Sequence, residues 1–147
     1  MKLWTPERPR MIVRPVAGES EAEYTVLADR VYKLGDAGWY DDEALNAAPQ
    51  GRMFYGLERL LTEGRTRGIS VVLATTRPVG VHNRAISEAN HLFAFDLLLE
   101  GDRRKLAGFV GPSILAPDLL RVPHSFGYFS PDDGEPFRVY APVPARG

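Results

Sequence analysis

The stretch ISVVLAT, residues 69–75, decides the fold class of this 147-residue chain. It is apolar without a regular alternation, it is rich in β-branched side chains, and it follows a predicted helix at residues 51–68. A strand of this kind is typical of a parallel sheet that is covered on both faces. We therefore expect an α/β fold in which a parallel sheet of about four or five strands is flanked by helices.

Helix and strand patterns continue on both sides of this stretch. Apolar residues at helical spacing predict helices at residues 20–35, 51–68, 83–90 and 100–111. Short β-like runs predict strands at residues 10–16, 37–42 and 91–99, and a C-terminal β-hairpin around residues 124–129 and 137–142. We expect a single domain over residues 1–147, with an N-terminal strand and linker (1–19), an α/β part (20–111) and C-terminal strands (112–147).

Composition limits the classes of function. The chain has 18 basic and 19 acidic residues, a net charge of -1, no cysteine and no apolar run long enough for a membrane span. These values predict a cytoplasmic protein with no membrane partner, and they exclude attraction of nucleic acid by the whole surface. A local basic cluster remains at Arg103, Arg104 and Lys105, which is interpreted either as a solvated helix face or as a contact for DNA phosphates or a neighbouring subunit.

Three acids in a row follow the predicted strand at residues 37–42: Asp41, Asp42 and Glu43. Like charges this close repel, and a metal ion or arginines would relieve the cost. The carboxyl ends of parallel strands lie at one edge of a sheet, so we expect these acids beside Thr75 and Thr76. One acid of an Asp-Glu pair can hold a Mg²⁺-bound water while the other polarises an attacking water. The alternatives are a solvated acidic turn and threonine hydroxyls that satisfy the backbone.

Two arginines, Arg65 and Arg67, end the predicted helix at residues 51–68. Guanidinium groups there can meet phosphate oxygens, most usefully on a neighbouring subunit. The alternative is that both arginines complement the dipole at the carboxyl end of the helix.

Together, YDDEA, the following helix and EGRTRGISVVLATTRP resemble the second half of a FtsK/HerA-type P-loop ATPase core over roughly residues 26–111. This superfamily includes DNA translocases, conjugation coupling proteins and viral genome-packaging motors. The resemblance implies a partial P-loop NTPase core in which residues 20–111 supply the part from Walker B to the sensor strand. It also implies a role in an ATP-dependent nucleic-acid translocase, with DNA as a possible partner.

The resemblance implies a role for each candidate site residue. Asp42 would be the Walker B carboxylate that binds Mg²⁺ and the nucleotide, and Glu43 would be the base that orients the attacking water. Thr76 would occupy the sensor position, with Thr75 beside it as a cofactor-binding residue. A trans-acting arginine finger would come from Arg65 or, as the second choice, Arg67.

The sequence also departs from the family pattern. It contains no G-x-x-x-x-G-K-[ST] loop, and Thr76 stands where the family has glutamine. ATP and Mg²⁺ are therefore expected only if another segment or a Walker A-bearing partner chain supplies the phosphate loop. Strand edges left free by its absence predict a homo-oligomer or such a partner. The alternative functions are a non-catalytic pseudo-ATPase module for structure or oligomerisation, and a plain nucleic-acid-binding domain.

Overall fold

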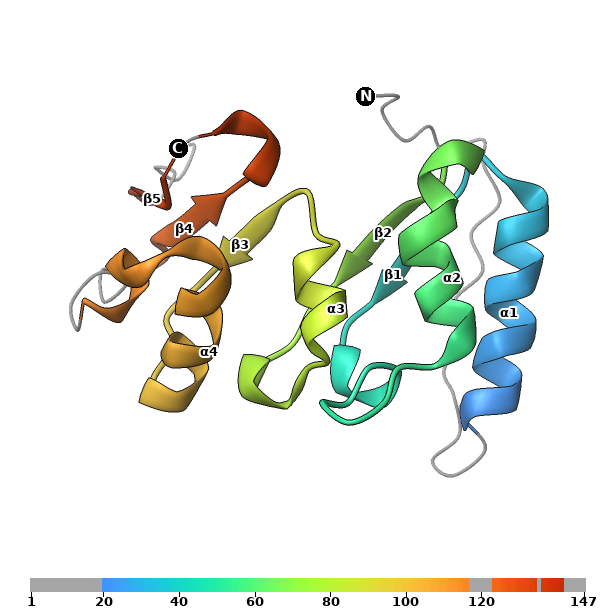
Figure 1. Cartoon of the computed structure of the whole chain (residues 1–147), viewed down its shortest axis with the longest axis horizontal. Coiled ribbons are helices and arrows are strands. Elements are labelled where there is room, and N and C mark those ends of the chain that lie inside the picture. The colour runs from blue at the N-terminus through green and yellow to red at the C-terminus, as the bar shows by residue number, and fades with distance from the viewer. Residues whose placement is uncertain (1–19, 117–122, 135, 142–147) are drawn as a thin grey trace, which may run out of the picture.

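The computed structural model describes residues 20–116, 123–134 and 136–141 (Figure 1). The helices are α1 (Ser20–Leu34), α2 (Tyr55–Glu63), α3 (Asn83–Ser87) and α4 (Glu100–Val110). The strands are β1 (Gly38–Asp41), β2 (Ser70–Leu73), β3 (Leu92–Ala94), β4 (Phe126–Phe129) and β5 (Arg138–Tyr140). This order confirms the predicted succession of elements from residue 20 onward, and the predicted strand at residues 10–16 lies outside the described residues.

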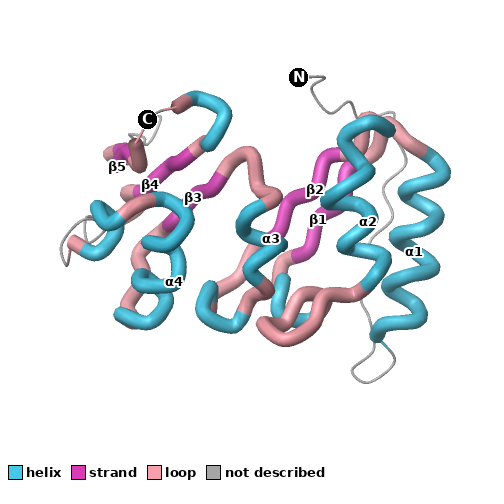
Figure 2. Tube along the Cα trace, viewed as in Figure 1, coloured by secondary structure: helices cyan, strands magenta, loops and turns pink. Residues whose placement is uncertain are grey.

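Strands β1 and β2 form a two-stranded parallel sheet, as the sequence predicts. Trp39 is opposite Val71 and Asp41 is opposite Leu73, so the two strands end at the same level. Helix α2 connects them, which is the right length of crossover for a parallel pair. Figure 2 shows both strands beside α1 and α2.

One face of this sheet packs against α1 and α2. The core there contains Tyr24 and Ala28 from α1 and Leu57 and Leu60 from α2, and Leu57 and Leu60 are fully buried. Trp39, Val71 and Leu73 of the strands pack against these helices. Burial of these aliphatic side chains holds the strands in place, because a parallel pair this short is not stable alone.

The opposite face of β1 and β2 is exposed, so the prediction that both faces of this strand are covered is wrong for the described residues. Tyr40 is 69% exposed and Val72 is 53% exposed. The burial pattern of each strand alternates between exposed and half-buried, because the described helices α1 and α2 cover only the face of Trp39 and Val71.

The remaining strands form a second sheet, which corrects the prediction of a single parallel sheet. Its order is β3-β4-β5, and both pairs are antiparallel. The physical reason is the short connection between β4 and β5, where Gly134 has a positive φ of 63° and the chain reverses. The predicted C-terminal hairpin is confirmed, and β3 adds to it.

Helix α4 covers one face of this second sheet. Leu106 and Val110 of α4 are buried with Ala94 of β3 and with Ile114 and Phe137. The other face carries aromatic side chains in contact with one another, such as Phe126 stacked on Tyr140 with ring centroids 5.2 Å apart. Phe93 and Phe95, 57% and 62% exposed, extend this face, so each sheet has a bare apolar side in the described residues.

Two boundaries differ from the sequence prediction. Helix α2 begins at Tyr55 rather than at residue 51, because Arg52 N–H donates to the Pro49 carbonyl (2.9 Å) and keeps the chain in a turn. Strand β3 ends at Ala94, before the predicted residue 99. No helix in the described part of the chain is long and apolar enough to span a membrane.

The contact between α1 and α2 gives a stability prediction. A Cβ at Gly56 would lie 2.7 Å from the Ala28 Cβ and 3.0 Å from the Thr25 Cα. We expect Gly56→Ala to lower the free energy of unfolding by about 1–3 kcal/mol, measured by urea denaturation, because the helices must move apart. Gly108→Ala in α4 is the control: its Cβ would meet nothing within 4 Å, and we expect a gain of about 0.5–1 kcal/mol. Equal effects of the two substitutions would contradict the close helix crossing.

Candidate active site

The loops that follow β1 and β2 leave the sheet side by side. Ala74 N–H donates to the Asp41 carbonyl (2.8 Å), and Ala44 N–H donates to the Ala74 carbonyl (2.8 Å). These two bonds continue the parallel ladder beyond Leu73. They confirm the sequence prediction that the acids and the threonines meet at one edge of the sheet.

Asp41 is the half-buried member of the acidic run. Its Oδ2 accepts from the Tyr24 hydroxyl (3.1 Å) and its Oδ1 accepts from Glu43 N–H (3.2 Å), while Trp39 Nε1 donates to the Tyr24 oxygen (3.0 Å). The sequence suggested that a metal ion or arginines would offset the repulsion among the acids. At Asp41, neutral hydrogen-bond donors, the Tyr24 hydroxyl and Glu43 N–H, take that role. Asp41 therefore belongs to the core network of α1 and β1, rather than to a surface open to substrate.

Burial controls protonation in this network. Burial raises the pKa of Asp41 above its ordinary value of 3.8, and the hydrogen bonds from Glu43 N–H and Tyr24 only partly oppose this effect. The neighbouring Asp42 and Glu43 charges raise the pKa of Asp41 further. Burial also raises the pKa of Tyr24, with the nearby Asp41 carboxylate as the second cause, so Tyr24 remains a hydroxyl donor.

Glu43 is held at the edge by two donors. The Thr75 hydroxyl donates to Glu43 Oε1 (3.1 Å), and Leu45 N–H donates to the same oxygen (3.4 Å). The second bond caps the short 3₁₀ turn Ala44–Asn46. Glu43 is only half-buried, so its other oxygen is available to a molecule at this edge.

Asp42 and Thr76 do not take part in the hydrogen bonds that join Glu43 and Thr75. Both are exposed, and in the described part of the chain neither side chain forms a hydrogen bond or ion pair. The contact from the second strand to the acids is thus made by Thr75 and not by Thr76. Thr75 Oγ1 also accepts from Arg77 N–H (3.1 Å), which fixes its hydroxyl direction toward Glu43.

A magnesium ion fits Asp42 better than it fits the cluster as a whole. In the described residues, no group of three His, Cys, Asp or Glu side chains is arranged to hold a metal by itself. Mg²⁺ in phosphate sites is usually bound by one or two carboxylates, with waters and substrate phosphates as the other ligands. Asp42, exposed and unpaired in this part of the chain, meets that requirement, whereas Asp41 is occupied by Tyr24.

Arg65 and Arg67 lie at the other end of β2. They belong to the 3₁₀ turn Gly64–Arg67, which follows α2 and precedes the start of β2, away from Thr75 (Figure 1). Arg67 donates to the carbonyls of Tyr32 (3.1 Å) and Lys33 (3.0 Å), the two residues before the last residue of α1. Arg65 is exposed, and its guanidinium has no hydrogen bond or ion pair within the described residues.

Sequence reasoning missed Asp102 in α4. Asp102 is only 2% exposed; its Oδ1 accepts from Val79 N–H (2.8 Å), and its Oδ2 lies 3.4 Å from Arg77 Nε. The available signal was its spacing: residues 102, 106 and 110 lie on one helix face, and the other two are apolar. An acid on the apolar face of a helix indicates a buried partner.

The basic cluster of α4 is used within the chain. Arg103 Nη1 donates to the Leu97 carbonyl (3.2 Å), Arg104 pairs with Glu100 (2.7 Å), and Lys105 Nζ donates to the Val81 carbonyl (3.1 Å). These contacts favour a structural role for the cluster over the contact with DNA phosphates.

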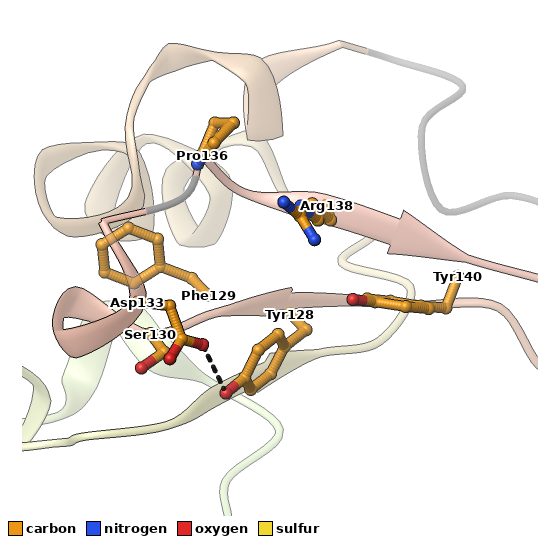
Figure 3. A pocket seen from close by; sticks show the side chains of 7 residues that line it. All are labelled: Tyr128, Phe129, Ser130, Asp133, Pro136, Arg138 and Tyr140. Carbon is orange, nitrogen blue, oxygen red and sulfur yellow. Dashed lines mark hydrogen bonds between the residues drawn. The ribbon is translucent and has the colours of Figure 1, made fainter.

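A hollow of about 330 Å³ lies in the second sheet (Figure 3). Its walls come from β4, β5 and the turn between them; the lining residues are Tyr128, Phe129, Ser130, Asp133, Pro136, Arg138 and Tyr140. The Tyr128 hydroxyl donates to Asp133 Oδ2 (3.4 Å), as the dashed line shows. Nothing from β1, β2 or the loops after them lines this hollow, so it is separate from the acidic edge.

Comparison with known proteins relates the chain to DNA packaging ATPases. Over 106 residues, 71% of this chain, it is 33% identical to the DNA packaging ATPase P9 of Enterobacteria phage PRD1. The chain is homologous to this packaging ATPase, but it spans only 45% of the length of P9. No protein-family model matches the chain.

Solved structures establish the fold. The genome packaging NTPase B204 of Sulfolobus turreted icosahedral virus 2, in complex with ATP-gammaS, matches with a TM-score of 0.75 and 13% identity, over 88% of this chain and 65% of that chain. B204, the DNA-packaging ATPase of Sulfolobus turreted icosahedral virus, matches with a TM-score of 0.65 and 14% identity, over 84% and 60% of the two chains. The chain thus has the fold of part of a packaging NTPase.

The burial of Asp41 gives a pH prediction. Because its pKa is raised in the folded protein, the folded state binds this proton more tightly, and stability falls as the pH rises from 3.8 through the raised pKa. Asp41→Asn removes that loss and keeps an acceptor oxygen. We expect the free energy of unfolding of the variant, relative to the unmodified chain, to increase with pH across this window in urea unfolding. Asp96→Asn, an exposed acid after β3, is the control, and pH profiles of Asp41→Asn that run parallel to those of the unmodified chain would contradict the assignment.

Proposed function

We propose that this chain is the Walker B and sensor half of an ATP-dependent DNA-packaging translocase. The observation that supports it most directly is the Thr75–Glu43 hydrogen bond of 3.1 Å across the ends of two parallel strands. A carboxylate held in this way, in a chain homologous to a DNA packaging ATPase, fits the residue that orients water for attack on a phosphate.

Each residue at the edge has a defined task in this proposal. Glu43 accepts a hydrogen bond from the attacking water through the carboxylate oxygen that Thr75 does not occupy. Thr75 holds the Glu43 carboxylate at one angle, and Thr76, exposed beside it, is free to contact a phosphate oxygen. Asp42 would be the residue that holds Mg²⁺. When bound, the ion neutralises the charge that develops on the phosphate oxygens.

ATP hydrolysis in this proposal needs a phosphate loop from a segment outside the 147 residues or from a partner chain. The unpaired edges of β2 and β3 and the bare face around Tyr40 and Val72 support such an arrangement. In Figure 1 the arrows of β2 and β3 point the same way, and neither strand has a partner on its second edge among the described residues. A strand and helix that carry the loop would pair with the free edge of β2 and cover the bare face.

The position of Arg65 favours action on a neighbouring subunit. It lies at the end of β2 that is opposite to Thr75, so it does not face Glu43 of its own chain. In a homo-oligomer, an exposed arginine at this end can reach the phosphates bound at the next subunit. Arg67 is the weaker candidate because its guanidinium already binds the end of α1.

Substitution of Glu43 tests the catalytic proposal. Glu43→Gln keeps an acceptor oxygen for Thr75 but removes the carboxylate charge that polarises the water. We expect ATP turnover, measured as phosphate release with a phosphate-loop segment or partner present, to fall about 10²–10⁴-fold. Glu23→Gln, an exposed acid on α1, is the matched control and should leave turnover unchanged.

Unchanged turnover in Glu43→Gln would contradict the role of this residue. Normal folding with no turnover under any of these conditions would instead support the alternative, a pseudo-ATPase module that contributes structure or an arginine to an active neighbour.

Mixed assemblies test the trans role of Arg65. We expect Arg65→Ala and Glu43→Gln chains each to lack turnover, and an equal mixture of the two to regain part of it. The reason is that an intact Arg65 from one chain then meets an intact Glu43 from the other. Arg30→Ala, another exposed arginine, serves as the control and should keep full turnover. A mixture that stays as inactive as its components would contradict a trans-acting Arg65.

A further inference from the structure

Asp102 is the only charged side chain that is buried in the described part of the chain. It lies on α4, which packs against the second sheet, yet both of its contacts go to the loop after β2. A buried carboxylate without partners is costly, and these two contacts compensate for the loss of water. Its presence at a helix face that otherwise buries Leu106 and Val110 therefore calls for a function that an apolar residue would not fulfil.

The contacts of Asp102 continue to the candidate active site. Asp102 Oδ2 pairs with Arg77 Nε (3.4 Å), Arg77 N–H donates to Thr75 Oγ1 (3.1 Å), and the Thr75 hydroxyl donates to Glu43 Oε1 (3.1 Å). Polar contacts thus lead from the buried acid of α4, through Arg77 and Thr75 in the loop after β2, to the Glu43 carboxylate after β1.

Helix α4 also holds the 3₁₀ turn Pro78–Gly80, which follows Arg77 in the loop after β2. The turn has no capping side chain of its own, and Asp102 supplies the acceptor by binding Val79 N–H (2.8 Å). Three residues further along α4, Lys105 Nζ donates to the carbonyl of Val81 (3.1 Å), which follows the turn. Contacts from α4 therefore hold the loop before the turn at Arg77, within it at Val79 and after it at Val81.

We propose that Asp102 is a positioning residue for Glu43. It sets the place of Arg77, and through Arg77 and the Thr75 hydroxyl it sets the direction of the Glu43 carboxylate. Because α4 packs against the second sheet, the contact between Asp102 and Arg77 couples the position of that sheet to the site at the end of the first sheet. The catalytic meaning of this coupling rests on the proposed function of Glu43, whereas the coupling itself does not.

The charge of Asp102 is separated from its capping role by two substitutions. Asp102→Asn keeps an oxygen acceptor for Val79 N–H and removes the charge that attracts Arg77. Arg77→Met removes the other partner and keeps much of the side-chain length. Glu100→Gln, on the same helix, is the matched control, because among the described residues this acid pairs only with Arg104.

The test is NMR on the full 147-residue chain, with the Glu43 side-chain carboxyl carbon, the Thr75 methyl group and the backbone amides as probes. In Asp102→Asn we expect the Glu43 and Thr75 signals to move and the Arg77 amide to exchange about tenfold faster, because its hydrogen bond to Thr75 is loosened. The Val79 amide should keep its protection. Arg77→Met should give the same shifts, and the double variant should add nothing to them.

Unmoved Glu43 and Thr75 signals in a folded Asp102→Asn chain would overturn the proposal, as would shifts of equal size in Glu100→Gln. In an assembly that hydrolyses ATP, we also expect Asp102→Asn to lower kcat with little change in KM, since the nucleotide contacts remain. A lower free energy of unfolding together with a higher KM, at unchanged kcat, would mean a structural role only and would contradict positioning of Glu43. Absence of turnover in the unmodified chain combined with a phosphate-loop segment or partner would contradict the proposed function, and the NMR result would still decide the coupling.

Discussion

The parallel pairing of β1 and β2 is the constraint on which the rest of this structure depends. Two backbone hydrogen bonds extend it past the strands, from Ala74 to Asp41 and from Ala44 to Ala74, each of 2.8 Å. They force the two loops to leave the sheet together, and they place Thr75 within hydrogen-bond distance of Glu43. In an antiparallel pair the same residues would lie at opposite ends of the strands.

The second feature that defines the molecule is what its sheets leave open. Each sheet is covered on one face by described helices and exposes apolar or aromatic side chains on the other, Tyr40 and Val72 in the first sheet and Phe93 in the second. Exposed apolar patches of this kind usually mark interaction surfaces. These open faces support the proposed arrangement, in which a further segment or a partner covers them.

The sequence predicts local elements and the parallel pair well, because β-branched residues and helical spacing act over short distances. It does not predict that β3 pairs with the hairpin, since antiparallel register depends on contacts between residues 92 and 129, far apart in the chain. The proximity of the acids after β1 and the threonines after β2 is predicted by the order of the strands alone. Three other features depend on side-chain directions, which only packing determines. These are the contact of Thr75 rather than Thr76 with the acids, the separation of Asp41 from the other acids, and the burial of Asp102.

The central claim is that nucleotide phosphates bind beside Glu43 and Thr75. Paramagnetic broadening of NMR signals by Mn²⁺-ATP, in the chain combined with a phosphate-loop segment, tests this most directly because the ion replaces Mg²⁺ at the phosphates. The account predicts that the amides of Asp42, Glu43 and Thr75 broaden first and that those of β4 and β5 remain sharp. Broadening centred on the hollow beside Tyr128, with the acidic edge unaffected, would contradict it.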